Sequence, residues 1–198
     1  MDRDRGSPAE SGAARDERWF EAEVAAVAPS LFAWAGLRIP ADMRATIAPE
    51  DVVQETWVRA LEVLPRFDPA RGPFRAFVFR VAKNILLESF RRFEAARRTG
   101  LGEGGVDESR AFRLEGVPAS ATAVSQRVAR DETLQTFVEE ALRLARDDRD
   151  LLIACGLEER LPTEVAVELG LTRDAAVKRW QRLRARLSRR AAFRVLLA

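Results

Sequence analysis

Apolar side chains recur every three or four residues along most of the chain, which is the spacing of one face of an α-helix. The alternation of apolar and polar positions that is typical of a strand is weak throughout. The sequence therefore predicts an all-α protein. Two apolar stripes show the helical spacing most clearly and are expected to face the core: Val53, Trp57, Ala60, Leu61 and Leu64 in one helix, and Phe74, Phe77, Val78, Val81 and Ile85 in the next.

The chain of 198 residues divides into four parts by composition. Residues 1–15 are rich in charged residues, glycine and serine, and are predicted to be disordered. A helical block covers residues 16–98, with breaks expected near Pro29, Pro40 and the stretch Pro65–Pro73. The segment 99–126 contains many glycines and has no steady apolar period, so we expect a flexible linker. A second helical block covers residues 127–198, and the prediction is thus two small helical domains joined by this linker.

The second block contains a pattern typical of a helix-turn-helix. Thr163 and Thr172 are placed to cap two successive helices, because a threonine oxygen accepts hydrogen bonds from the free N–H groups at a helix start. Gly170 lies between them and can adopt the positive φ that a tight turn needs. Ala166 and Ala176 are small enough to let the two helices cross closely. In such a unit the second helix enters the major groove of DNA; a plain helical hairpin with a basic face is the alternative.

Basic residues are concentrated in two segments of the chain. Residues 75–98 carry 7 basic and 2 acidic side chains, and residues 173–198 carry 9 basic and 1 acidic side chain. Residues 1–62 and 99–172 are net acidic, and the net charge of the whole chain is only +2. Two separate basic segments indicate two contacts with a polyanion such as nucleic acid, or else two solvated helix faces.

Histidine is absent and Cys155 is the only cysteine. The sequence therefore excludes catalytic sites that need histidine, zinc sites built from cysteine and histidine, and intramolecular disulfide bonds. Catalysis by carboxylates alone and Mg²⁺ sites remain open on composition. Because the sequence shows no coherent carboxylate constellation, we expect no catalytic residue, no metal ligand and no cofactor, and we expect Cys155 to be a small buried side chain. The polar start from Met1 to Arg18 and the short apolar stretches predict a cytoplasmic protein without membrane insertion.

Two helix faces outside the apolar stripes carry candidate chemistry. Asp51, Gln54 and Glu55 form an acidic face, which is either solvated or a docking surface for a basic partner. In the following helix Phe79 borders a basic face that contains Lys83. An aromatic ring beside cations is suited to bind single-stranded nucleic acid, because the ring stacks on an unpaired base. An aromatic residue at helical spacing is also a common core residue.

Three motifs occur in a fixed order along the chain: Asp51-Val-Val-Gln-Glu55 followed by Phe67-Asp68, then Gly72-x-Phe74-x-x-Phe77-Val-x-Arg80-Val-Ala-x-Asn84, and then the helix-turn-helix pattern at Thr163–Arg182. Together these motifs resemble the extracytoplasmic-function group of bacterial sigma factors. The resemblance extends from about Trp19 to Arg190, except for the linker. It implies a sigma domain 2-like unit in residues 16–98 and a sigma domain 4-like helix-turn-helix in residues 127–198.

The resemblance also implies partners and a role for each matching residue. The partners are the core of bacterial RNA polymerase, promoter DNA and an anti-sigma factor; the protein would lie at the nucleoid through the polymerase and would have no enzymatic activity. The residues implied to bind the polymerase are Asp51, Gln54 and Glu55. Those implied to bind and open the −10 promoter element are Phe67, Asp68, Arg71, Arg75, Phe79, Arg80, Lys83 and Asn84. Those implied to bind the −35 element are Thr172, Arg173, Asp174, Val177, Lys178, Arg179 and Arg182.

Two other functions are compatible with parts of the sequence. A stand-alone helix-turn-helix regulator with an N-terminal sensory or dimerisation domain would explain residues 163–190 and would bind its operator without polymerase. A helical adaptor whose basic faces bind acidic proteins would show no dependence on DNA. The stand-alone regulator does not account for the acidic face at Asp51–Glu55 or for the basic aromatic helix.

Overall fold

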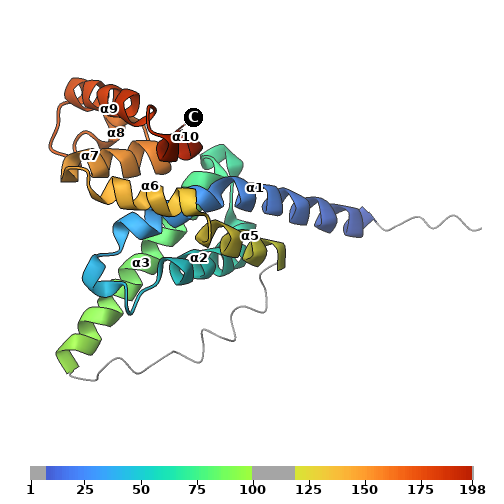
Figure 1. Ribbon diagram of the computed structural model, residues 1–198. Helices are drawn as coiled ribbons and strands as arrows, with labels where there is room; N and C mark the ends of the chain where they lie inside the picture. The colour runs from blue at the N-terminus through green and yellow to red at the C-terminus, as the bar shows by residue number, and fades with distance from the viewer. Residues whose placement is uncertain (1–7, 100–118, 198) are drawn as a thin grey trace, which may run out of the picture.

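The structure is a computed structural model that describes residues 8–99 and 119–197. The regular elements in these ranges are all helical, which confirms the predicted all-α class. The N-terminal unit, residues 8–99, contains three long helices joined by short helical turns (Figure 1). These elements are α1 (Pro8–Arg38), η1 (Ala41–Met43), α2 (Pro49–Val63), η2 (Leu64–Arg66), η3 (Pro69–Arg71) and α3 (Phe74–Thr99).

The C-terminal unit, residues 119–197, is a set of shorter helices. Most of the expected linker lies outside the described residues, but its last part, residues 119–126, belongs to a helix. The elements are α5 (Ala119–Ala129), α6 (Glu132–Leu142), α7 (Arg146–Leu151), the π-helical segment η5 (Leu152–Leu157), α8 (Pro162–Val165), α9 (Arg173–Leu187) and α10 (Ala191–Leu197).

The boundaries of the first helices follow from local chemistry only in part. α2 begins at Pro49, whose fixed φ suits a first helical turn, and Glu50 and Asp51 complement the positive end of the helix dipole. α1 begins at Pro8, so residues 8–15 are helical where the sequence predicts disorder. Pro29 lies inside α1 without ending it. The proline removes one backbone donor, but the helix around it is buried in the core, and this tertiary packing outweighs the local loss.

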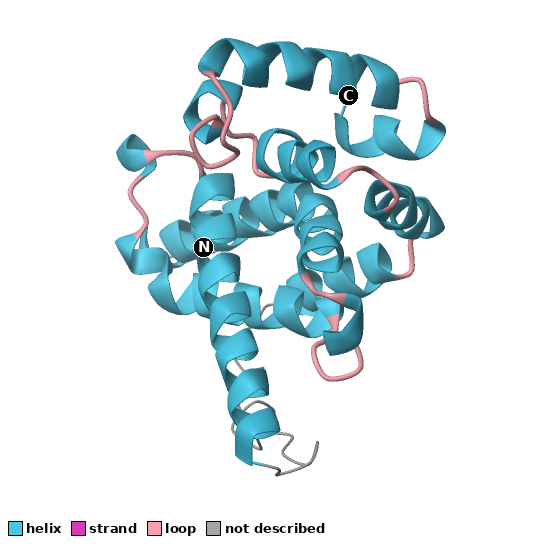
Figure 2. Cartoon of the chain, turned by 90° about the vertical axis from the view of Figure 1, so that its left-hand side faces the viewer, coloured by secondary structure: helices cyan, strands magenta, loops and turns pink. Residues whose placement is uncertain are grey.

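One hydrophobic core extends through both units. Trp34 of α1 and Trp57 of α2 belong to the same buried cluster as Phe137 of α6 and Leu152 of η5. α1 packs against α2 and α3 of its own unit and against α5 and α6 of the C-terminal unit (Figure 1). α5 also packs against α2, and Figure 2 shows the helices and their connecting loops after a turn of 90°. The two predicted apolar stripes do face this core; Leu61, Leu64 and Val81 are half-buried and the other members are buried. The two helical units are therefore in direct contact.

One stretch of α1, Arg18–Arg38, is long and apolar enough to cross a membrane by length and composition alone. This stretch is longer than the apolar stretches expected from the sequence, and that expectation is corrected. The most apolar window of the stretch is 67% buried inside the protein. The helix is thus the central core helix of the fold, and its apolar surface is covered by neighbouring helices.

Candidate nucleic-acid interface

α3 presents an exposed polar face to solvent. Arg80, Lys83 and Asn84 are exposed and lie within about one helical turn of one another. Leu87, the next residue on this face, is 47% exposed. Leu87 is not among the residues predicted from the sequence, although its position four residues after Lys83 indicates that it shares this face. Because the opposite face of α3 is buried, this set of two cations, one amide and one apolar side chain is held at the surface.

The loop before α3 is held in place by local contacts. Asp68 Oδ1 accepts a hydrogen bond from the Ala70 backbone N–H at 3.0 Å, which starts η3. Gly72 has φ 146° and ψ 172°, a conformation that is accessible essentially only to glycine. Arg71 is exposed at the loop surface, where its Nε lies 4.0 Å from Asp68 Oδ2. Asp68 and Arg71 are thus available at the surface beside the start of α3.

Phe67 is anchored in an aromatic cluster. Its ring centroid lies 5.7 Å from that of Phe74 and 5.2 Å from that of Phe77. Trp19 of α1 stacks on Phe67 at 6.0 Å and meets Phe74 at 5.2 Å. The sequence analysis did not predict this cluster, because Trp19 is distant in the chain. Through these contacts Phe67 anchors the loop to α1 and α3. Its side chain is half-buried, so part of the ring stays at the surface.

Arg75 lies at the contact with the C-terminal unit, and Phe79 lies beside it in the core. Phe79 is 5% exposed, and its ring meets that of Trp34 edge-to-face at 5.9 Å. Arg75 donates from Nε and Nη2 to the Leu157 carbonyl oxygen at 2.9 Å and 2.7 Å. Burial lowers the pKa of Arg75, and the carboxylate of Glu159 opposes this effect. The Phe79 ring is therefore part of the core beside Trp34, and its role in base stacking stays a prediction.

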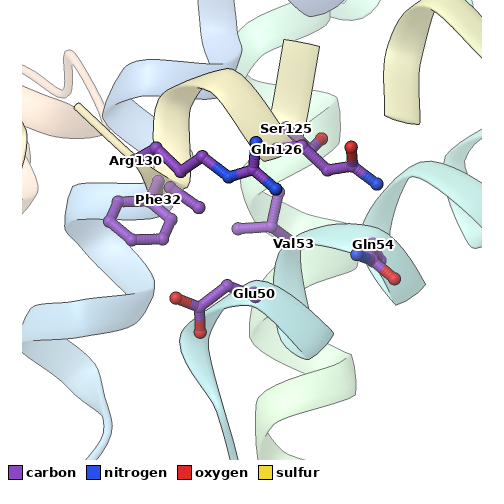
Figure 3. A pocket seen from close by; sticks show the side chains of 8 residues that line it. Phe32, Glu50, Val53, Gln54, Ser125, Gln126 and Arg130 are labelled. Atoms are coloured by element: carbon purple, nitrogen blue, oxygen red, sulfur yellow. The ribbon is translucent and has the colours of Figure 1, made fainter. Parts of the chain in front are cut away.

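The predicted acidic face of α2 is half-buried. Asp51, Gln54 and Glu55 all keep part of their surface exposed, and Glu55 Oε1 lies 3.8 Å from Arg59 Nε. Gln54 lines a cavity of about 200 Å³ between α1, α2 and α5. Figure 3 shows Arg130, which directly follows α5, on the opposite side of this cavity from α2. α5 therefore lies next to the acidic face.

The helix pair α8 and α9 has the predicted turn between its members. Gly170 has φ 65°, and Thr172 Oγ1 accepts a hydrogen bond from the Ala175 backbone N–H at 3.2 Å, which caps α9. The buried Ala176 lies on the inner side of α9. The start of α8 differs from the prediction: Leu161 is the cap residue, and its N–H donates to Glu164 Oε2 at 3.2 Å. Thr163 lies inside α8.

The exposed face of α9 carries most of the residues assigned to the −35 element. Arg173, Lys178 and Arg182 are exposed, and Lys178 Nζ lies 2.9 Å from Asp174 Oδ2. Gln181 is also exposed, one turn after Val177, and was missed by the sequence analysis. Gln181 could have been identified from its spacing, because it lies one turn after Val177 and three residues after Lys178. Its amide can also donate to and accept from an adenine edge.

Arg179 differs from the other members of this set because it faces α7. Its Nε donates to Asp148 Oδ1 and its Nη1 to Asp147 Oδ2, both at 2.9 Å. Arg186 donates to the other oxygen of Asp148 at 2.7 Å. Partial burial would raise the pKa of Asp148, but the hydrogen bonds from Arg179 and Arg186 lower it. The expectation that Arg179 points to DNA is therefore corrected: its guanidinium joins α9 to α7.

The remaining candidate chemistry is limited. Cys155 is buried in η5 as expected, and burial raises the pKa of its thiol to about 11. The thiol is therefore protonated at neutral pH. Within residues 8–99 and 119–197, no group of three or more acidic or cysteine side chains is placed to hold a metal ion.

Comparison with known proteins identifies the family of this chain. Residues 24–97 match the family model for sigma-70 region 2. The chain is also 32% identical, over 142 residues, to the RNA polymerase sigma factor CnrH of Cupriavidus metallidurans, an alignment that covers 70% of this chain and 71% of the relative. The chain is an extracytoplasmic-function sigma factor. No solved structure matches this sigma factor significantly. Sigma factors act in transcription initiation with RNA polymerase.

Proposed function

We propose that this sigma factor directs promoter-specific initiation by reading a −35 element with α9 and opening a −10 element with α3 and the preceding loop. The observation that supports the proposal is the presence of two exposed basic helix faces on one chain, α3 around Lys83 and α9 around Lys178. A single DNA contact would need only one such face. The family membership makes promoter DNA the natural polyanion for both.

In the upstream contact α9 lies in the major groove of intact duplex. Arg173, Lys178 and Arg182 bind phosphates or base edges, and Gln181 and Val177 lie between them on the same face. Thr172 and Asp174 lie at the N-terminal end of α9, where a helix that enters the groove comes closest to the bases. Arg179 supports this face from behind through its ion pairs with α7.

In the downstream contact the DNA is single-stranded. Arg80 and Lys83 hold the backbone while Asn84, Asp68 and Arg71 contact unpaired bases. Separating stacked bases costs a few kcal/mol per base, so the open strand needs contacts that the closed duplex does not have. Arg75 joins this surface when its hydrogen bonds to the Leu157 carbonyl are released, and Phe79 joins it when Trp34 of α1 no longer covers its ring.

The polymerase core contacts the acidic face of α2, where Asp51, Gln54 and Glu55 lie. One chain on the polymerase carries both DNA contacts. When one contact has formed, the other DNA-binding face is held close to its site, so its effective concentration there is raised. The sigma factor acts in the cytoplasm and reaches the nucleoid with the polymerase. The anti-sigma factor that the resemblance implies remains a prediction.

Run-off transcription with core polymerase and genomic promoter fragments tests the proposal. The wild-type protein should yield specific transcripts, and the double variant Arg80→Ala/Lys83→Ala should reduce permanganate reactivity of −10 thymines. The matched control is Arg143→Ala/Arg146→Ala, which removes the same charge from exposed positions outside both faces. Equal opening by the two variants would contradict the role of α3, and promoter binding without polymerase would support the stand-alone regulator instead.

A further inference from the structure

Trp19 of α1 is more exposed than any other aromatic side chain in the described part of the chain. Its exposed fraction is 38%, whereas Phe79, the ring that the sequence assigns to base stacking, is 5% exposed. A single apolar side chain at the surface is common in proteins and needs no function by itself. The neighbours of Trp19 therefore decide whether its indole is suited to bind a ligand.

The indole of Trp19 is held in a fixed position by other rings. Phe20, the next residue of α1, is 1% exposed and meets Phe74 at 5.8 Å, so the core fixes the backbone beside Trp19. The ring of Phe67 lies at 21° to the indole, nearly parallel to it, and the ring of Phe74 lies at 73°. The indole is thus oriented before any ligand binds, which lowers the entropic cost of binding.

The rings around Trp19 lead to the exposed basic face of α3. Phe67 lies between Trp19 and Phe77, with centroid distances of 6.0 Å and 5.2 Å. On the other side of Phe77, the guanidinium of Arg80 lies 5.9 Å from the ring centre. Arg80 is one of the two cations proposed to hold the opened strand. Three successive contacts therefore connect Trp19 to this cation, a distance that a few nucleotides of one strand can span.

Exposed cations also lie in the loop that packs on Trp19. Arg66 directly precedes Phe67 and is exposed, and the side chain of Arg71 is 86% exposed. A site for single-stranded nucleic acid combines cations that hold the backbone with a ring that stacks on a base. The loop and the start of α1 place both kinds of side chain together at the surface.

We propose that Trp19 is a base-stacking residue of the −10 contact, and that its exposed indole receives one unpaired base of the opened promoter strand. This inference rests on the proposed −10 role of α3 and the loop before it. Because Phe67 lies nearly parallel to the indole, a base on the exposed side extends an existing stack. Trp19 thus supplies an aromatic surface without any movement of the core around Phe79.

The contact of Trp19 with a base favours the open promoter over the closed duplex. In the duplex both faces of a base are covered by its neighbours in the stack, so the indole has no free face to bind. Once the strands separate, stacking on the indole compensates part of the cost of unstacking. Stacking on an aromatic ring tolerates every base, so Trp19 stabilises the opened strand and does not select its sequence.

The test measures binding of fork-junction DNA to the complex of the full-length protein with core polymerase. The DNA has a duplex upstream part and a single-stranded −10 tail, and its sequence comes from a promoter that the wild type opens in the run-off experiment. An abasic nucleotide is placed at each tail position in turn. At the position that stacks on Trp19, loss of the base should weaken binding of the wild type by about tenfold.

Two substitutions at the same position separate stacking from packing. Trp19→Leu keeps an apolar side chain against Phe67 but removes the flat ring, and it should weaken binding of the intact fork by about tenfold. In this variant the abasic nucleotide at the stacking position should cause no further loss, because the base has already lost its partner. Trp19→Phe keeps a ring and should retain most of the affinity. Both variants should bind a fully duplex promoter fragment as the wild type does, with unchanged helix content by circular dichroism.

Equal affinity of the wild type and Trp19→Leu for the intact fork would overturn the stacking role. A loss in Trp19→Leu that is the same at every abasic position, or that extends to the duplex fragment, would also overturn it, since Trp19 would then only support the loop.

Failure of the proposed −10 role is recognised separately. The wild type with core polymerase would then open no thymines, or Arg80→Ala/Lys83→Ala would open them normally, and the stacking role of Trp19 would fall with the −10 role. Opening that depends on Arg80 and Lys83, together with equal fork affinities of the wild type and Trp19→Leu, would reject the role of Trp19 alone.

Discussion

The ion pairs of Arg179 predict that this residue contributes to the stability of the fold and not to DNA binding. Replacing Arg179 by alanine removes two contacts at 2.9 Å, one to Asp148 and one to Asp147. Arg186 still donates to Asp148 at 2.7 Å, so no carboxylate is left buried without a partner. We therefore expect a moderate loss of stability and little direct effect on the DNA contact.

The size of the stability loss in Arg179→Ala follows from how exposed Arg179 and its two partners are. Exposed ion pairs contribute about 0.2–1 kcal/mol each, and hydrogen bonds to charged groups contribute about 1.5–3 kcal/mol when they are sheltered from water. Arg179 is about one-third exposed and Asp147 is well exposed, which favours the lower part of these ranges. The expected loss is about 1–2 kcal/mol, and each kcal/mol lowers the Tm of a chain of this length by about 2–4 °C.

The contribution of Asp148 to the unfolding free energy depends on pH in a defined direction. The pKa of Asp148 is lowered in the folded protein, so its contribution to stability is present above the pKa of an unfolded aspartate, about 3.9. This contribution is lost as the pH falls through the lowered folded pKa. The difference in unfolding free energy between the wild type and Arg179→Ala should therefore be largest near neutral pH and should shrink in strong acid.

The assay combines thermal unfolding by circular dichroism with DNA binding over a range of salt concentrations. Arg182→Ala is the matched control, because Arg182 is exposed on the same helix and, among the described residues, donates only to the Lys178 carbonyl. The control should leave the Tm nearly unchanged. It should reduce the salt slope, which is the slope of log K for DNA binding against log salt concentration, by about one unit. A normal Tm together with a reduced salt slope for Arg179→Ala would refute the structural role of this residue.

Three further outcomes are expected. Gly72→Ala should destabilise the protein by about 1–3 kcal/mol in denaturant unfolding, because φ 146° strains any side chain, and an unchanged midpoint would contradict that conformation. Cys155 should react with a thiol reagent at neutral pH only after unfolding, since it is buried with a pKa of about 11; rapid reaction of the native protein would disagree. Trp57→Phe should cost about 1–3 kcal/mol, because it removes the 3.0 Å hydrogen bond from Nε1 to Ser125 and leaves a small void; equal stability would argue against the packing of α5 on α2.

Several local features were predictable because they depend on residues close together in the chain. The stripe of α2 around Val53 and Trp57 lies in the core, since helical spacing alone decides which side chains share a face. The cap at Thr172 and the positive φ of Gly170 are likewise properties of short segments. The surface residues of α3 follow from the same helical spacing, including Leu87, which the sequence analysis overlooked.

The assignment of individual side chains to DNA was less predictable. Arg179 belongs to the basic segment of α9, but its partner Asp148 lies 31 residues away, and no local pattern indicates that pairing. Phe79 borders a basic face by its spacing, yet Trp34 of α1 covers its ring. In both cases a residue of suitable chemistry is used by a contact that forms only when distant helices meet.

By itself the sequence determined the helical class, the order of the motifs, the two basic faces and the family, because periodicity, capping and charge are properties of neighbouring residues. Only the tertiary structure decided that the two units share one core and that the carboxylate of Glu158 meets Trp34, a residue 124 positions away. The physical reason is that apolar burial is not directional. An amphipathic helix shows which face will be covered, whereas the partner that covers it depends on how the whole chain packs.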